Sequence, residues 1–128
     1  MMGVVDAHHH LWDLSRGRYP WLQQDYDAER FHLGEYRTLC RDFLPADYQV
    51  VSEGCNMVAT VHVEAERDRS EQVAETAWLH AVHARHGFPN AVVAHAWLDR
   101  PDSDQQLAEQ AAWPLVRGIR SKPVTSRS

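Results

Sequence analysis

Short apolar runs alternate with amphipathic stretches along the chain. The runs rich in β-branched residues predict four strands, at Gly3–His8, Met57–Glu64, Ala91–Leu98 and Leu115–Arg120. Between the later strands, the sequence predicts a helix from Ser70 to His86, with Gly87 as its C-terminal cap. It predicts another helix from Asp102 or Ser103 to Ala112. In the Ser70–His86 helix, an i, i+4 stripe predicts the buried side, made of Val73, Ala74, Ala77, Trp78, Ala81 and Val82.

The segment between the first two predicted strands has weaker signals. Polar and aromatic residues with Gly17 and Pro20 predict a long loop from His9 to Gln24. A short helix is predicted from Glu35 to Phe43. Pro45 then starts a further helical turn, because proline is tolerated in the first turn of a helix, and Gly54 is a plausible end of that turn.

Regular alternation of strands and helices predicts an α/β fold. The second and third strands are nearly continuous apolar runs, as in a parallel sheet covered on both faces. A doubly wound sheet and a (β/α) barrel both fit this order, although no G-x-G-x-x-G follows any strand. A complete barrel needs eight strands in about 250 residues, so these 128 residues correspond to about half of one. Residues 121–128 predict a polar loop after the fourth strand.

Composition and charge limit the classes of partner. The formal net charge is −5 and the arginines are scattered, which argues against a nucleic-acid-binding surface. No apolar run approaches the length of a membrane span, and the N-terminus does not resemble a signal peptide. Cys40 and Cys55 are expected to be free thiols. We therefore expect a cytoplasmic protein with no nucleic-acid or membrane partner.

The most informative segment is the end of the first strand. Side chains alternate along a strand, so His8 and His10 share one face and His9 takes the other. Two imidazoles on one face can hold one divalent cation, and the C-terminal ends of barrel strands carry the chemistry. Asp6 has the same parity and is predicted to orient a ligand histidine.

Other residues at strand ends are candidates for substrate contact. The Arg120 guanidinium, after the fourth strand, could clamp a carboxylate with two parallel hydrogen bonds. Glu64 could contact substrate hydroxyls and Trp97 could line a pocket, although core packing is as plausible for Trp97. His62 is interpreted as a core histidine. Three further histidines, His80, His83 and His86, are interpreted as a solvated helix face.

The opening Asp6-Ala-His8-His-His10-Leu-Trp12-Asp13, followed by Tyr19-Pro-Trp-Leu22, resembles the start of the amidohydrolase-related family of hydrolases. The similar branch contains sugar-acid lactonases and pyrone-dicarboxylate lactonases. Further matches are Asp42-Phe-Leu-Pro-Ala-Asp47, Val61-His-Val-Glu64, Trp97-Leu-Asp99 and Arg117-Gly-Ile-Arg120. The resemblance covers essentially the whole chain.

This resemblance implies the N-terminal half of a (β/α)8 TIM barrel, with residues 1–128 as a partial domain. It implies that His8 and His10 are first-strand ligands of one divalent metal, most simply zinc, and that Arg120 binds substrate. It also implies later active-site histidines and an aspartate general base on strands outside these residues, so no catalytic residue is assigned within the chain. The implied activity is opening of a small carboxylated or sugar-acid lactone by a metal-activated water.

Two alternatives stay open. One is a metal-independent hydrolase or a decarboxylase on the same scaffold, because a fold does not determine a reaction. The other is a non-catalytic half-barrel that is inert or associates with itself, since an open parallel sheet has two unpaired edges.

Overall fold

Four parallel strands form one sheet in the computed structural model, which describes residues 1–122. Their bounds are β1 Val4–His9, β2 Met57–Val63, β3 Ala91–His95 and β4 Val116–Arg120, and their spatial order is the sequence order. Each strand pairs in parallel with the next one along the chain. The α/β fold with four parallel strands is thereby confirmed. Residues 123–128 of the expected polar loop lie outside the described part.

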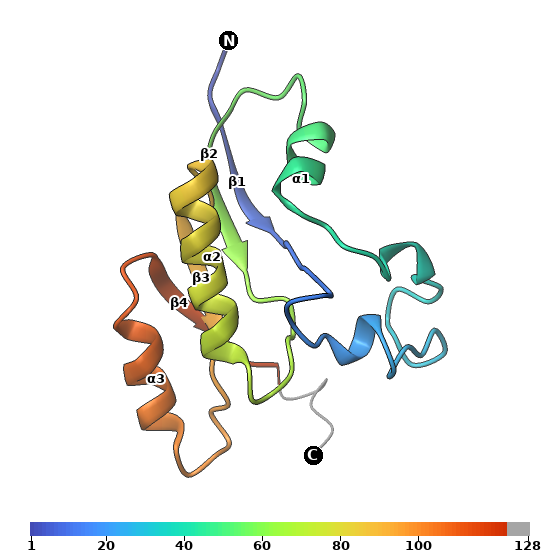
Figure 1. Ribbon diagram of the computed structural model, residues 1–128, viewed down its shortest axis with the longest axis vertical. Helices are drawn as coiled ribbons and strands as arrows, with labels where there is room; N and C mark the ends of the chain where they lie inside the picture. Colours follow the sequence, from blue (N-terminus) through green and yellow to red (C-terminus); the bar gives the residue numbers. More distant parts are fainter. Residues whose placement is uncertain (123–128) are drawn as a thin grey trace.

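The helices are α1 Pro45–Val51, α2 Gln72–His86 and α3 Ser103–Ala111. Figure 1 shows α2 and α3 side by side on one face of the sheet, while α1 lies nearer the free edge of β1. Gly87 ends α2 with a left-handed φ of 81°, which glycine adopts at little steric cost. None of the helices in the described residues is long and apolar enough to cross a membrane.

The core between the sheet and α2 is centred on Leu79. This side chain is fully buried against Val92 and Ala94 of β3, with Ile119 of β4 beside them. A second cluster lies under α1, where Tyr48 and Val82 pack on Leu11. These two clusters attach α1 and α2 to the sheet.

The buried side of α2 is more polar than the predicted stripe. The buried residues are Glu75, Thr76, Leu79 and Val82. Of the expected stripe, Ala74 and Ala81 are exposed and are wrong, whereas Val73, Ala77 and Trp78 are half-buried. Thr76 donates a hydrogen bond from Oγ1 to Oε1 of Gln110 in α3, at 2.7 Å. Gln110 in turn donates to the backbone carbonyl of His95, at 2.9 Å. Backbone groups at the end of β3 need such partners, which explains why polar residues replace apolar ones there.

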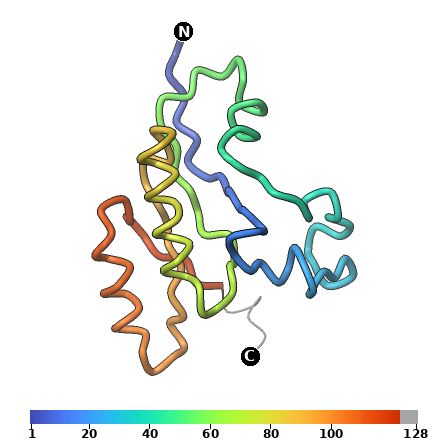
Figure 2. The backbone as a smooth tube through the Cα atoms, in the orientation of Figure 1, coloured from blue at the N-terminus to red at the C-terminus, as the bar shows by residue number. Residues whose placement is uncertain are grey.

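Figure 2 shows the long connection from β1 to α1. Its aromatic side chains form a cluster of their own. Trp12, Tyr19 and Leu22 are buried together. The predicted helix from Glu35 to Phe43 is wrong, since only a single 3-10 turn forms, at Arg37–Leu39. Phe43 instead forms an antiparallel bridge with Trp12, through two backbone hydrogen bonds of 3.0 Å, and this bridge requires extended backbone.

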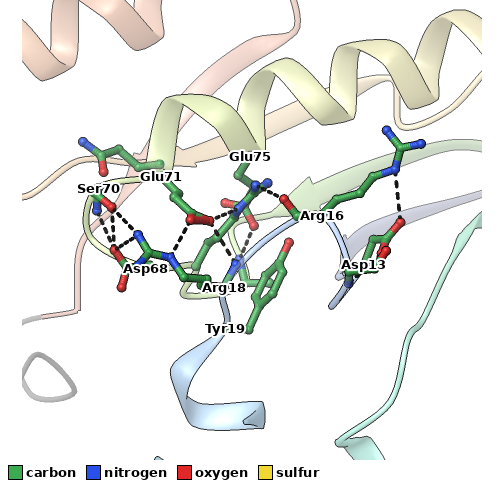
Figure 3. Close-up of polar contacts among 12 residues, drawn as sticks. Asp13, Arg16, Arg18, Tyr19, Asp68, Ser70, Glu71 and Glu75 are labelled. Carbon is green, nitrogen blue, oxygen red and sulfur yellow. Dashed lines mark hydrogen bonds and ion pairs between the residues drawn. The ribbon is translucent and has the colours of Figure 1, made fainter. Parts of the chain in front are cut away.

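Charged residues fasten this connection to the segment between β2 and α2 (Figure 3). The Arg18 guanidinium donates to Glu71 Oε2 and to Ser70 Oγ, both at 2.9 Å. Arg67 donates to Glu71 Oε1 at 3.0 Å and to the Arg16 backbone carbonyl at 2.9 Å. The two loops that follow β1 and β2 are therefore held together at the C-terminal end of the strands.

Replacement of Leu79 by alanine tests the core. We expect L79A to lower the free energy of unfolding by about 2–5 kcal/mol, because a fully buried leucine leaves a cavity. The matched control is V50A, whose side chain is 70% exposed and whose loss is expected to change stability by about 0.5 kcal/mol or less. Urea denaturation measures both, and equal effects of the two variants would contradict this assignment of the core.

Candidate active site at the end of β1

A bulge in β1 decides where its histidines point. Asp6 pairs with Thr60 and His9 pairs with His62, so three residue steps on β1 face two on β2. His9 is buried, with its ring 4.5 Å from that of Tyr48 and its Nε2 2.9 Å from Thr60 Oγ1. His9 therefore belongs to the packing between β1 and α1, as its parity predicts.

Asp6 does not orient a histidine ring, and this part of the prediction is wrong. Its Oδ2 accepts a 2.7 Å hydrogen bond from the Tyr48 hydroxyl, and its Oδ1 accepts one from the His8 backbone N–H. The bulge breaks the simple alternation between Asp6 and His8, so the carboxylate turns towards α1. Simple strand parity could not have revealed this.

His8, within the bulge, and His10, just after β1, lie together. Their ring centroids are 5.0 Å apart and the ring planes are almost perpendicular. His10 Nδ1 lies 2.7 Å from the Val63 backbone oxygen, which only accepts hydrogen bonds, so Nδ1 carries the proton. Burial lowers the pKa of His10, only partly offset by the Val63 carbonyl. The ring is thus neutral near pH 7, with a lone pair on Nε2.

This arrangement has the donor chemistry that zinc prefers. With Zn–N distances of about 2.0–2.1 Å, two imidazoles on a tetrahedral ion have ring centroids about 5 Å apart. A histidine ligand usually donates its other ring N–H to an oxygen, as His10 does to Val63. Among residues 1–122, however, no group of three or more candidate ligand side chains comes together. His8 and His10 therefore fit part of a metal site, and the ligand role of both stays a prediction.

His62 of β2 is fully buried next to the end of β1. Its Nε2 accepts a 2.9 Å hydrogen bond from the Leu11 backbone N–H, and burial lowers its pKa well below the usual value. The interpretation as a neutral core histidine fits this contact. His80 is also structural, because its Nε2 accepts from the Leu115 backbone N–H and so links α2 to the segment just before β4. The expected solvated face of α2 is therefore only partly correct.

Glu64 and Arg120 form an ion pair across the ends of β2 and β4. Arg120 Nε donates to Glu64 Oε1 at 2.8 Å, and Arg120 Nη2 donates to the Glu64 backbone carbonyl. Glu64 is fully buried, and its Oε2 also accepts from the Glu66 backbone N–H at 2.7 Å. Burial raises the pKa of Glu64, but His95 and Arg120 outweigh it and hold the value at about 2. The sequence suggested both residues as substrate contacts and did not predict their pairing.

Trp97 lies beyond the end of β3, next to these residues. Its ring is buried, 4.3 Å from the His95 ring, and the Arg69 guanidinium lies 3.7 Å from its centroid. In this position Trp97 packs against polar neighbours. Substrate contact by Arg120, Glu64 and Trp97 stays a prediction.

Sequence patterns missed Glu75, which lies in the buried side of α2. Its Oε2 accepts a 3.0 Å hydrogen bond from the Ala65 backbone N–H. Burial, and to a smaller extent the nearby Glu64 carboxylate, raise the pKa of Glu75 to about 8. Glu75 is therefore mostly protonated at neutral pH. A single charged residue in a helix gives no signal in the sequence that it is buried. The only hint is that Glu75 follows the end of β2 after one short loop.

Comparison with known proteins places this geometry in context. No family model matches the chain. The uncharacterized protein y4mH of Sinorhizobium fredii is 34% identical over 119 residues, which are 93% of this chain and 39% of that protein. L-fucono-1,5-lactonase of Burkholderia ambifaria is 29% identical over 116 residues, covering 91% of this chain and 35% of the lactonase.

A solved structure is similar over a comparable share of this chain. The crystal structure of an amidohydrolase from Burkholderia multivorans with bound zinc superimposes with a TM-score of 0.56 and 27% identity, over 91% of this chain and 36% of that one. The four parallel strands and their helices match half of that amidohydrolase barrel. These findings support an amidohydrolase-related family. The chain spans 39% and 35% of the two curated relatives.

The buried Glu75 predicts a specific pH dependence of stability. Its folded-state pKa lies above its unfolded value, so its contribution is present at low pH and is lost as pH rises to about 8. The lowered pKa values of His9, His10 and His62 act in the opposite direction around pH 6.5, which is the ordinary pKa of histidine, and this effect fades as the pH rises above about 7. We expect stability to fall between pH 7 and 8, by at most about 1.4 kcal/mol per pH unit.

E75Q should remove this slope, because the amide keeps the shape of the side chain and does not titrate. Urea denaturation at several pH values between 7 and 8 measures it. An unchanged slope in E75Q would show that another group titrates there.

Proposed function

We propose that this chain supplies the first-strand part of the active site of an amidohydrolase-type hydrolase that opens a small lactone. The observation that carries the proposal is the pair of imidazoles at the C-terminal end of β1, His8 and His10, with ring centroids 5.0 Å apart. The similarity to a lactonase and to a zinc-containing amidohydrolase supports the reaction class and the metal.

In this proposal, His8 and His10 are two ligands of one divalent metal, most simply zinc. The neutral His10 ring, fixed by its Nδ1–H donated to Val63, presents Nε2 without the cost of losing a proton. When bound, such a metal lowers the pKa of water and stabilises negative charge on a carbonyl oxygen.

Lactone opening adds a water oxygen to the ring carbonyl carbon, and the ring C–O bond then breaks. The leaving oxygen must gain a proton and the attacking water must lose one, so a general base and acid are required. Two buried carboxyl groups among the described residues could be considered as the base. Glu64 is paired with Arg120, and the hydrogen bond that Glu75 accepts comes from the Ala65 backbone and not from His8 or His10. We therefore propose that the base and the remaining ligands come from outside these 128 residues.

Self-association is the second candidate, because β1 and β4 each have an unpaired edge in the described sheet. In this case the chain would be a non-catalytic half of a barrel. Unpaired strand edges favour pairing with further strands of any origin, so they do not distinguish the two candidates. The candidates differ in whether His8 and His10 bind a metal ion. A metal-independent reaction would likewise leave these histidines without a bound ion.

Zinc binding tests the proposal. We expect the chain to take up zinc in competition with a chromophoric chelator, and H8A and H10A each to weaken the affinity at least about tenfold, as loss of a ligand does. The matched control is H86A, which removes an exposed histidine from the far end of α2. Zinc affinity that survives both H8A and H10A would contradict the metal assignment.

A further inference from the structure

We propose that an open hollow between the end of β1 and α1 binds a small neutral aromatic molecule that carries a hydroxyl group. The hollow has a volume of about 330 Å³. Small-molecule sites commonly span roughly 300–1,000 Å³. His8 is not among the lining residues. The inference therefore goes beyond the proposed function, which concerns the metal that His8 and His10 are proposed to hold together.

The walls of the hollow are apolar. They are formed by α1 and by the connection that precedes it, with lining side chains from Trp12, Leu39, Phe43, Tyr48 and Val51. Val51 is 67% exposed and Leu39 is 36% exposed. Apolar surface that remains open to water at a hollow favours a ligand that removes this surface from water.

Three of these wall residues present aromatic rings. The rings of Trp12 and Phe43 have centroids 6.2 Å apart and planes tilted by 49°. The third ring is that of Tyr48. Aromatic rings attract one another in offset-stacked or edge-to-face arrangements, beyond the gain from buried area. A planar aromatic ligand therefore fits these walls better than an aliphatic chain of the same volume.

One lining residue has a buried polar atom without a partner. His9 lines the hollow and is only 7% exposed. Its Nε2 lies 2.9 Å from Thr60 Oγ1, whereas its Nδ1 is buried and makes no hydrogen bond within the described residues. Buried polar atoms almost always have a hydrogen-bond partner in folded proteins. We therefore assign His9 Nδ1 as the polar contact of the ligand.

A hydroxyl group suits this nitrogen in either tautomer of His9. The Thr60 hydroxyl can donate to Nε2 or accept from it, so Nδ1 is a donor in one tautomer and an acceptor in the other. A ligand hydroxyl can also do both. A carboxylate only accepts, and the described residues that line the hollow include no lysine or arginine to balance its charge. An anion would lose hydration there without an opposite charge in return.

Two matched probes test the site, 2-naphthol and 2-naphthoate, which carry a hydroxyl or a carboxylate on the same ring system. Binding to the chain is followed by NMR titration at pH 7, where the naphthol is neutral, as the tyrosine phenol is. EDTA is present, so that the result does not depend on a metal at His10. We expect saturable binding of 2-naphthol, at least about fivefold tighter than that of 2-naphthoate.

Filling the hollow should remove the site. V51W places an indole at its rim, and we expect the affinity for 2-naphthol to fall at least about tenfold, because the side chain takes the space of the ligand. The matched control is V50W, at the preceding position of α1, which is similarly exposed but does not line the hollow. We expect V50W to bind 2-naphthol as the unmodified chain does.

The polar contact has its own variant. H9F keeps a ring at this position and removes both nitrogens, and we expect at least about threefold weaker binding of 2-naphthol, as loss of one hydrogen bond predicts. An unchanged affinity in H9F would contradict the contact with Nδ1. The comparison of V51W with V50W decides whether the hollow is the site even where H9F does not fold.

Several outcomes would overturn the inference. They are no saturable binding of 2-naphthol, equal affinity for the two probes, or equal effects of V51W and V50W. Analytical ultracentrifugation of the unmodified chain tests the other occupant of such a surface. A dimer that V51W dissociates and V50W does not would show that a second copy covers the hollow, and it would contradict a small-molecule site. Loss of zinc binding with intact binding of 2-naphthol would contradict the proposed function alone.

Discussion

The pairing of β1 with β2 through a bulge is the constraint on which the site depends. Without the extra residue step between Asp6 and His9, strict alternation would place Asp6 on the face of His8 and His10. The bulge instead gives the Asp6 carboxylate to Tyr48 of α1 and places His9 under the same tyrosine. β1 is thus fixed to α1 on one side. The rings of His8 and His10 lie together, with centroids 5.0 Å apart.

Buried charge organises the same C-terminal end of the sheet, after β2 and β4. Glu64 stays ionised because Arg120 and His95 surround it, whereas Glu75, one helix turn into α2, takes up a proton. The two carboxyls share one short backbone segment, since Glu64 accepts from the Glu66 N–H and Glu75 from the Ala65 N–H. Two like charges this close in a buried site do not both ionise at neutral pH, which is why their pKa values move apart. The network therefore links the loop after β2 to β4 and to α2.

The sequence predicted the strands well because β-branched runs bounded by glycine and proline are local signals. It predicted α2 and its cap for the same reason, and the order of alternating elements led directly to a parallel sheet. It failed where a long-range contact decides the local structure. The Trp12–Phe43 bridge replaces a helix that the local pattern favours, and Gln110 is buried because the His95 carbonyl needs a donor. Neither partner is visible within a short window of sequence.

The candidate site divides in the same way. His8 and His10 could be found from strand parity, because their role depends on neighbours in sequence. The pairing of Glu64 with Arg120 spans 56 residues and requires the register of β2, β3 and β4 to be known. Single residues at strand ends could therefore be named as candidates, whereas their mutual neutralisation could only come from the structure. The buried Glu75 likewise depends on how closely α2 packs on the end of β2.

The central claim is that His8 and His10 hold one metal ion together. The most direct measurement is a crystal structure of the chain soaked in zinc, with anomalous diffraction collected at the zinc absorption edge. The account predicts a single strong peak about 2.0–2.1 Å from a ring nitrogen of each histidine. A peak at other residues only, or His8 and His10 rings that point apart with no peak between them, would contradict it.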